Sequence, residues 1–297
     1  MTLVDTEPGA VTWSSWHLHL ASNARSVQDR VLREVVTPLV ARLPGQPWFF
    51  IRYWQAGIHL RLRIGDLDAA RCRDVEGWLR DGLAAAGSLR PGEPPVDEAA
   101  YYAEAAAHAA TERGADAVVR KLLPPGVHTA VYEPEDERYG GSHLMPHTER
   151  LFQLSSELVL RLLPGDGDAR TLSALALRGT MAAAAALDDP AEYYARSLDA
   201  WRAWGGAGGW GAAPIDRLFQ VGELTGRRPD PYAHGPFAGW HAALAELAGE
   251  IARSGRPPQQ ILFSHVHMLH NRLGRSIFEE LRTYAWLAAA FPEGARP

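Results

Sequence analysis

The sequence is poor in several residue types, and each shortage excludes a class of protein. Cys72 is the only cysteine among 297 residues, so neither a disulfide framework nor a cysteine-rich zinc or iron–sulfur site can form. Lys121 is the only lysine among the thirty basic residues, which leaves lysine Schiff-base chemistry a single candidate. The chain has no run of about 18 apolar residues, and its start lacks the basic and apolar regions of a secretion signal. These absences predict a cytoplasmic protein with no membrane partner.

The residues that are present predict a folded, mildly acidic protein. Hydrophobic residues make up 46% of the chain and charged residues 22%, and the formal net charge is −5. This balance is typical of globular domains, and the length suffices for one large domain or two modest ones. The acidic total argues against a broad nucleic-acid surface, so no direct nucleic-acid partner is expected. Cationic recognition must use arginine, whose guanidinium group fits carboxylates and phosphates.

Hydrophobic periodicity predicts a mixture of strands and helices in the first half of the chain. The expected strands are 11–21, 47–54, 58–64 and 127–133, and the expected helices are 26–43, 67–86, 97–113 and 115–122. The second and third strands are joined by a short connection that contains Gly57, which predicts a hairpin. Pro38 is expected to kink or divide the helix that contains it.

From Pro146 onward the pattern predicts helices alone. They are expected at 147–163, 168–187, 190–204, 214–225 and 237–253, with two more across 258–290. The predicted fold class is therefore α+β: an N-terminal half with a small mixed or antiparallel sheet and helices, and a helical C-terminal half. We expect a single domain over residues 1–297, with sub-parts 1–145 and 146–297.

The predicted hairpin carries a row of basic side chains. Residues two apart on a strand share a face, so His59, Arg61 and Arg63 point one way and the leucines between them point into the core. Arg52, on the preceding strand, joins this row or lies across the sheet from it, depending on the register. Such a row is either a solvated face neutralised by acidic partners or a pocket that binds a carboxylate or phosphate.

Two further segments carry polar groups of interest. The acidic segment 132–141 ends in two glycines, and it is either a surface turn or part of a site. In the segment 264–274, His267 shares a helix face with His270 and Asn271. His267 is either an interior histidine or a proton-transfer group near neutral pH.

Evidence for other chemistry is weak. His267 and His270 could hold a metal with His17 or His19, but no ligand motif supports such a site, so we predict neither a metal nor a cofactor. Glycine-rich phosphate loops and the GxSxG nucleophile motif are absent from the sequence. Trp210, in the glycine-rich stretch 205–214, is a core residue or lines a peptide groove.

Three segments together resemble a known family. The stretches WFFIRYWQAGIHLRLRI, YEPEDERYGG and HVHMLHNRLG occur in this order, and the resemblance runs from Trp13 to the last helices. They resemble the thiopeptide-type bacteriocin biosynthesis family, which is related to the C-terminal, glutamate-eliminating domain of class I lantibiotic dehydratases. The large glutamylating domain of full-length dehydratases has no counterpart in this sequence, so the chain looks like a stand-alone version.

The resemblance implies one of two reactions on a ribosomally made precursor peptide. In the eliminating branch, a partner protein that uses glutamyl-tRNA attaches glutamate to Ser or Thr, and the family member expels it to leave dehydroalanine or dehydrobutyrine. In the other branch, a pyridine synthase joins two dehydroalanines in a formal [4+2] cycloaddition and releases the leader peptide. A third possibility is a non-catalytic subunit that binds an acidic leader peptide through the basic hairpin.

The resemblance also implies site residues, and these favour elimination. The catalytic positions that match the family are Arg63, Arg138, His267 and Glu135. The expected substrate-binding residues are Arg52, His59, Arg61, Tyr139 and Asn271. In this scheme the arginines hold glutamate and polarise the ester, Glu135 orients Arg138, and His267 transfers the proton.

Overall fold

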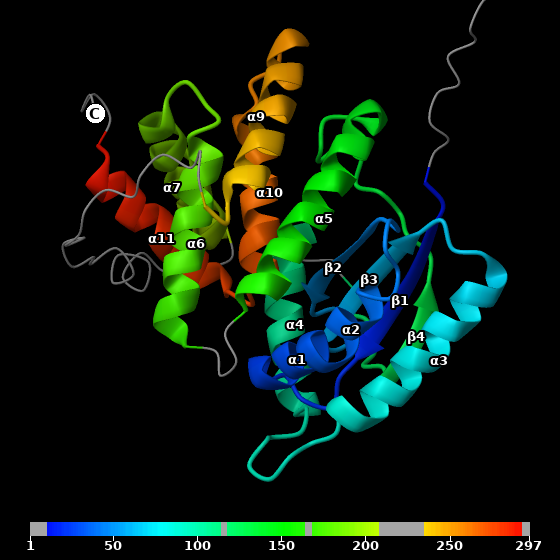
Figure 1. Ribbon diagram of the computed structural model, residues 1–297. Coiled ribbons are helices and arrows are strands. Elements are labelled where there is room, and N and C mark those ends of the chain that lie inside the picture. The colour runs from blue at the N-terminus through cyan, green and yellow to red at the C-terminus, as the bar shows by residue number, and fades with distance from the viewer. Residues whose placement is uncertain (1–10, 114–117, 164–167, 208–234, 293–297) are drawn as a thin grey trace, which may run out of the picture.

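The computed structural model describes residues 11–113, 118–163, 168–207 and 235–292, and its first half contains one four-stranded antiparallel sheet (Figure 1). The strands are β1 (Trp13–His19), β2 (Trp48–Tyr53), β3 (His59–Gly65) and β4 (Gly126–Ala130). They lie in the order β2-β3-β1-β4. The α+β prediction, with an antiparallel sheet and a helical C-terminal part, is confirmed.

The register of the hairpin assigns its side chains to the two faces of the sheet. Leu60, Leu62 and Ile64 are fully buried, as the alternation predicts. Arg52 pairs directly with Leu60, whereas Arg61 pairs with Ile51. Directly paired residues of antiparallel strands point to the same face. Arg52 therefore lies on the leucine face, opposite the face that carries Arg61.

Helices of the first half cover the leucine face (Figure 1). They are α1 (Arg25–Val31), a π-helical turn (Leu32–Val36), α2 (Thr37–Val40) and α3 (Ala69–Ala86). Pro38 lies in the first turn of α2, directly after the π-helical turn. We predicted that Pro38 kinks or divides this helix. The backbone stays helical from Arg25 to Val40, and the π-helical turn just before the proline interrupts the α-helical hydrogen-bond pattern.

The predicted helix over 115–122 is wrong in the part that the structure describes. After α4 (Glu98–Arg113), residues 118–124 are not helical. Their backbone bonds to other parts of the chain instead, since Leu123 donates to the Ala56 carbonyl at 2.9 Å and Tyr101 Oη donates to the Arg120 carbonyl at 3.0 Å. Pro124 and Pro125 then prevent the segment from closing a helical turn, which outweighs its helix propensity.

The second half is built from helices, as predicted. A 3₁₀ turn (Ser142–Leu144) leads into α5 (Met145–Leu162), α6 (Ala169–Ala184), α7 (Pro190–Ala207), α9 (Ala238–Arg253), α10 (Gln259–Arg272) and α11 (Ile277–Ala290). The predicted helix over 214–225 lies outside the described residues. Helices α5 and α10 pack against the edge strand β2, so one buried apolar cluster runs from Phe50 of the sheet to Leu269 of α10. None of the described helices combines the length and apolarity needed to cross a bilayer.

Candidate functional site

A cavity of about 860 Å³ opens where the hairpin meets α7, α10 and the start of α11. Eight of the nine residues singled out from the sequence line this cavity: Arg52, Arg61, Arg63, Glu135, Arg138, Tyr139, His267 and Asn271. His59 is not among its lining residues and lies 1% exposed behind Arg61. The fold thus brings segments more than 200 positions apart in the sequence to one site.

Two arginines of β3 present positive charge to the cavity without an acidic ion-pair partner among the described residues. Arg63 is 7% exposed, and its guanidinium carbon lies 4.6 Å from the ring centre of Tyr132 and 5.2 Å from that of Phe49. Its Nε has no hydrogen-bond partner in the described structure. Burial lowers the pKa of Arg63 to about 10, so the side chain remains a cation at neutral pH.

Arg61 extends this positive surface. Its guanidinium carbon lies 3.4 Å from the ring centre of Tyr53, and its Nε donates to His59 Nε2 at 3.2 Å. Aromatic rings attract a cation but do not cancel its charge, so both arginines retain donors for an anionic ligand. The arrangement suits a carboxylate or phosphate rather than a cationic ligand.

The acidic segment 132–141 forms a turn that places Arg138 beside α10. Arg138 Nη1 donates to Glu135 Oε2 at 3.1 Å and its Nε donates to Ser264 Oγ at 3.4 Å. Gly140 has a φ of +89°, and a β-carbon there would lie 2.7 Å from Ile261, so a glycine is required where the turn passes the helix. The side chain of Arg138 is 42% exposed, which leaves it accessible from the cavity.

His267 is oriented by a buried carboxylate. Its Nδ1 lies 2.9 Å from Oε2 of Glu280, on the neighbouring helix α11, and Glu280 is 1% exposed. Burial raises the pKa of Glu280, but its electrostatic interactions with His267 and His270 and the hydrogen bond from His267 outweigh burial, so the net pKa is lowered. The carboxylate is therefore ionised and accepts the Nδ1 proton, which leaves Nε2 as the proton-accepting atom of the ring.

Sequence reasoning missed Glu280. It follows Glu279, which forms a capping box with Ser276 at the start of α11, so the sequence signals a helix start and no site. Only the packing of α11 against α7 and α6 places the second glutamate beside His267.

Arg52 and Asn271 hold the strand β2 in place. The Arg52 guanidinium pairs with Asp29 at 2.5 Å and donates to Gln28 Oε1 at 3.1 Å, both in α1. The Asn271 side chain accepts from the Arg52 backbone N–H at 2.9 Å and donates to its carbonyl at 2.8 Å. Both residues border the cavity, but these polar atoms are already bonded within the protein.

The other histidines of α10 are interior residues. His270 is fully buried, its Nε2 lies 2.9 Å from Thr180 Oγ1, and burial lowers its pKa to about 4. His265 is 2% exposed, and burial lowers its pKa to about 3. Among the described residues, no three-ligand group includes His267 and His270.

Aromatic side chains form much of the remaining cavity wall. They are Phe49, Tyr53, Trp54, Tyr132, Tyr139, Phe152, Trp201, Trp204, Phe263 and Phe278. Burial raises the pKa of Tyr139 to about 12, so this phenol stays protonated. Trp210 lies outside the described residues. An apolar wall with a few convergent charged groups is typical of a site for an organic substrate.

Comparisons with known proteins agree with the resemblance seen in the sequence. The family model described as "Lantibiotic biosynthesis dehydratase C-term" matches residues 13–291. The structure resembles that of a pyridine synthase, TbtD, from thiomuracin biosynthesis, with 18% identity, coverage of 94% of this chain and 98% of that chain, and a TM-score of 0.63.

A second solved structure of similar fold is the tRNA-dependent lantibiotic dehydratase MibB from Microbispora sp. 107891. The identity is 23%, the TM-score is 0.50, and the match covers 97% of this chain but only 28% of that one. No curated protein matches the sequence. Because the family model spans nearly all of the described residues, the chain belongs to the lantibiotic biosynthesis dehydratase C-terminal family.

Proposed function

We propose that this protein is an enzyme that eliminates glutamate from glutamylated Ser or Thr residues of a ribosomally made precursor peptide. The products are dehydroalanine or dehydrobutyrine and free glutamate. The observation that carries the proposal is the pair of cavity-lining arginines, Arg61 and Arg63, which have no acidic ion-pair partner among the described residues. An eliminating enzyme needs such cations to bind the carboxylates of the departing glutamate.

The proton-transfer group in this proposal is His267. Its Nε2 removes the α-proton of the modified residue, and the electron pair of that bond becomes the Cα–Cβ double bond. The Cβ–O bond breaks, and glutamate leaves with the bonding electrons as a carboxylate. Glu280 stabilises the imidazolium that forms, because its ionised carboxylate lies 2.9 Å from Nδ1.

Arg138 stabilises the negative charge that develops during proton removal. It lies on the same cavity wall and is oriented by Glu135 at 3.1 Å and Ser264 at 3.4 Å. Donors aimed at an enolate or a leaving carboxylate lower the barrier most where water is scarce. Tyr139 and the aromatic wall supply apolar contacts for the peptide.

The proposal requires a glutamylating partner protein. The substrate is a peptide whose Ser or Thr already carries glutamate, so a protein that attaches glutamate from glutamyl-tRNA must act first. The partners in this proposal are therefore the precursor peptide and that glutamylating protein, with no direct contact to nucleic acid.

Turnover of a glutamylated precursor peptide, followed by mass spectrometry, tests the proposal. Arg63→Ala should slow elimination by roughly tenfold to a hundredfold, the range for loss of a charge-assisted hydrogen bond, and His267→Ala by roughly 10²–10⁴-fold. In both cases the glutamylated peptide accumulates. Arg196→Ala, which removes a 70% exposed arginine on α7, is the matched control and should leave the rate unchanged. Normal dehydration by both site variants would refute the assignment.

A second candidate function is pyridine formation from two dehydroalanines. It is favoured by the ten aromatic side chains of the cavity wall and by the fold shared over 98% of the pyridine synthase TbtD. That reaction has no glutamate to bind, so it does not explain the positive charges of Arg61 and Arg63. Incubation with a bis-dehydroalanine thiazolyl peptide distinguishes pyridine formation from glutamate elimination, because only a pyridine synthase releases a macrocycle and the leader peptide.

A non-catalytic leader-binding role predicts a different result. Such a subunit would retain the leader peptide in a pull-down and turn over neither substrate. Turnover of the glutamylated peptide excludes it.

A further inference from the structure

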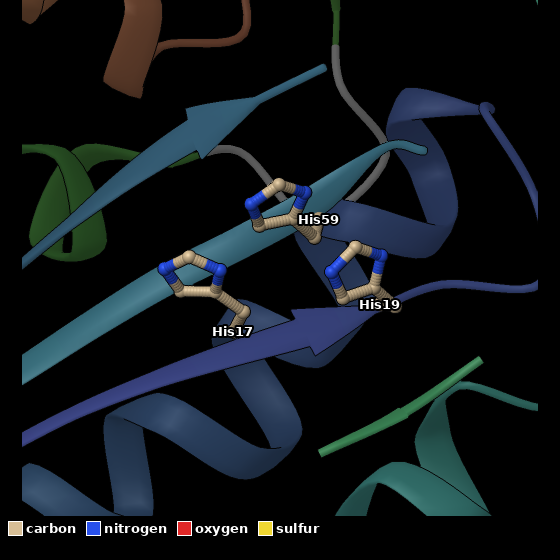
Figure 2. A group of neighbouring side chains, drawn as sticks. All are labelled: His17, His19 and His59. Carbon is tan, nitrogen blue, oxygen red and sulfur yellow. The ribbon is translucent and has the colours of Figure 1, made fainter. Parts of the chain in front are cut away.

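Three histidines gather on the sheet face that carries Arg61, outside the lining of the cavity (Figure 2). β1 places His17 and His19 on this face, and β3 places His59 directly opposite His19. One ring nitrogen from each histidine lies within 4.8 Å of the other two, and no other trio of metal-binding side chains is as close in the described part of the chain. Three converging imidazoles are the minimum protein contribution to many zinc sites.

The hydrogen bonds of His59 leave one nitrogen suited to a metal. Nδ1 lies 2.7 Å from the carbonyl oxygen of Gly57. A carbonyl only accepts, so Nδ1 carries the proton and Nε2 keeps a lone pair. Metal-binding histidines are commonly oriented by such a bond from the non-ligating nitrogen to a carbonyl.

His19 is a buried polar group without a partner. It is 2% exposed, and neither of its ring nitrogens has a hydrogen-bond partner in the described structure. An unsatisfied buried polar atom is costly to a fold. A bound ion would satisfy one of the two nitrogens.

The electrostatic surroundings of the three rings act in both directions. Burial is the largest cause of the lowered pKa values of His17, His19 and His59, and it keeps the rings neutral with lone pairs available. The positive charge of Arg61 contributes to all three shifts, and that of Arg63 to the shift of His17. These charges also repel a dication, so they weaken metal binding.

We propose that His17, His19 and His59 form a binding site for a divalent late transition-metal ion, with Zn²⁺ as the expected occupant. Imidazole ligands suit zinc, copper and nickel rather than calcium or magnesium. His17 is partly exposed, so the ion enters from that side and keeps an open position for water. The three histidines do not line the cavity that the proposed elimination uses, although Arg61 lines it and donates to His59.

Two further features reduce the affinity of this site. His19 and His59 are stacked, with ring centres 4.2 Å apart and planes at 19°, and the rings must rotate to bring their nitrogens to the spacing of about 3.3 Å found around tetrahedral zinc. The ion must also replace the hydrogen bond that Arg61 Nε donates to His59 Nε2 at 3.2 Å. The site should therefore bind zinc more weakly than a closed structural zinc centre does.

Titration of the metal-stripped full-length protein tests this proposal. Calorimetry should show one Zn²⁺ per chain, and Co²⁺ should give the visible d–d absorption of a low-coordinate site. His17→Ala and His19→Gln should each weaken Zn²⁺ binding at least about tenfold, since loss of an outer-shell partner alone has this effect. His147→Ala, at a half-exposed histidine of α5, is the matched control and should bind as the parent protein does.

Absence of stoichiometric binding, or equal affinity in the parent and both site variants, would overturn the proposal. So would an equal loss in the His147→Ala control, because binding would then be a general surface effect. If circular dichroism shows that His19→Gln does not fold, the affinity of His17→Ala for Zn²⁺ tests the proposal alone, because the His17 side chain is only partly buried. The titration uses no peptide, so its outcome is independent of the proposed elimination.

Discussion

The arginines around the cavity differ in what neutralises them. Arg52 is paired with Asp29 in the interior, and Arg138 with Glu135 near the surface. Arg61 and Arg63 contact aromatic rings instead. An internal carboxylate would compete with a substrate carboxylate for the same guanidinium group, whereas a ring does not. The two arginines of β3 are therefore the cations available to an anionic ligand.

At the same scale, the role of Glu280 can be tested by Glu280→Gln. The amide keeps the shape of the side chain but cannot stabilise an imidazolium at His267 by charge. We expect kcat for glutamate elimination to fall roughly tenfold to a hundredfold with little change in KM, within the range for impaired acid–base catalysis.

The chain offers a matched control for this substitution. His147 and Glu250 form a second histidine–glutamate pair, 3.3 Å apart and remote from the cavity lining. Glu250→Gln should leave kcat and KM unchanged. An unaltered kcat in Glu280→Gln would contradict the proposed positioning of His267.

At the scale of elements, β2 depends on helices for the partners that a neighbouring strand would otherwise supply. It is an edge strand, so one side of its backbone has no strand beside it. The Asn271 amide bonds both backbone groups of Arg52, and Ser156 Oγ accepts from the Phe50 N–H at 3.2 Å. Side chains of α10 and α5 thus cover the edge, which also protects it from pairing with another chain.

The ion pair between Asp29 and Arg52 ties the same strand to α1, and Asp29→Asn tests it. Removing one partner leaves Arg52 buried without its counter-charge, so we expect a loss of about 3 kcal/mol or more in the free energy of unfolding, measured in urea. The KM for the glutamylated peptide should stay near that of the parent protein. A raised KM with unchanged stability would show instead that Arg52 binds substrate.

Asp199→Asn is the control for this experiment. Asp199 pairs with Arg202 on α7, but its side chain is 73% exposed. Exposed pairs contribute little, so its unfolding free energy should change by less than about 1 kcal/mol.

At the scale of the whole molecule, buried histidines make the fold sensitive to acid. The pKa values of His265 and His270 are lowered, chiefly by burial, to about 3 and about 4, while both groups titrate near the ordinary value of 6.5 when unfolded. Below that value the unfolded chain takes up protons that the folded protein does not. Stability is therefore full above about pH 6.5 and is lost as the pH falls toward 4.

Urea unfolding at several pH values checks this prediction. We expect the unfolding free energy to fall by several kcal/mol between about pH 7 and about pH 4.5, because the lowered pKa values of His17, His19 and His59 contribute in the same direction. His265→Gln should reduce this dependence, and His147→Ala, at a half-exposed position, should not. Fluorescence and circular dichroism should give one coincident transition if residues 1–297 form the predicted single domain. An unfolding free energy that rises as the pH falls would contradict the lowered pKa values of the buried histidines.

Local sequence patterns determine much of this protein. Alternation in 58–64 predicted the strand β3 and placed Leu60, Leu62 and Ile64 in the core, and helical spacing predicted the C-terminal helices that the structure describes. These features depend on neighbours within a few positions. The segment 118–123 departs from its helical propensity because its partners, Ala56 and Tyr101, are distant in the sequence.

Only the tertiary structure determined which of the polar and charged side chains lie together. The motifs pointed to Arg63, Arg138 and His267, but that they line one cavity depends on how α10 and the segment 132–141 pack beside the hairpin. The register placed Arg52 on the opposite face, and the contact of α11 with α10 revealed Glu280. The grouping of His17 and His19 with His59 likewise depends on the pairing of β1 with β3. Local periodicity specifies each element, whereas long-range packing determines which charges share a site.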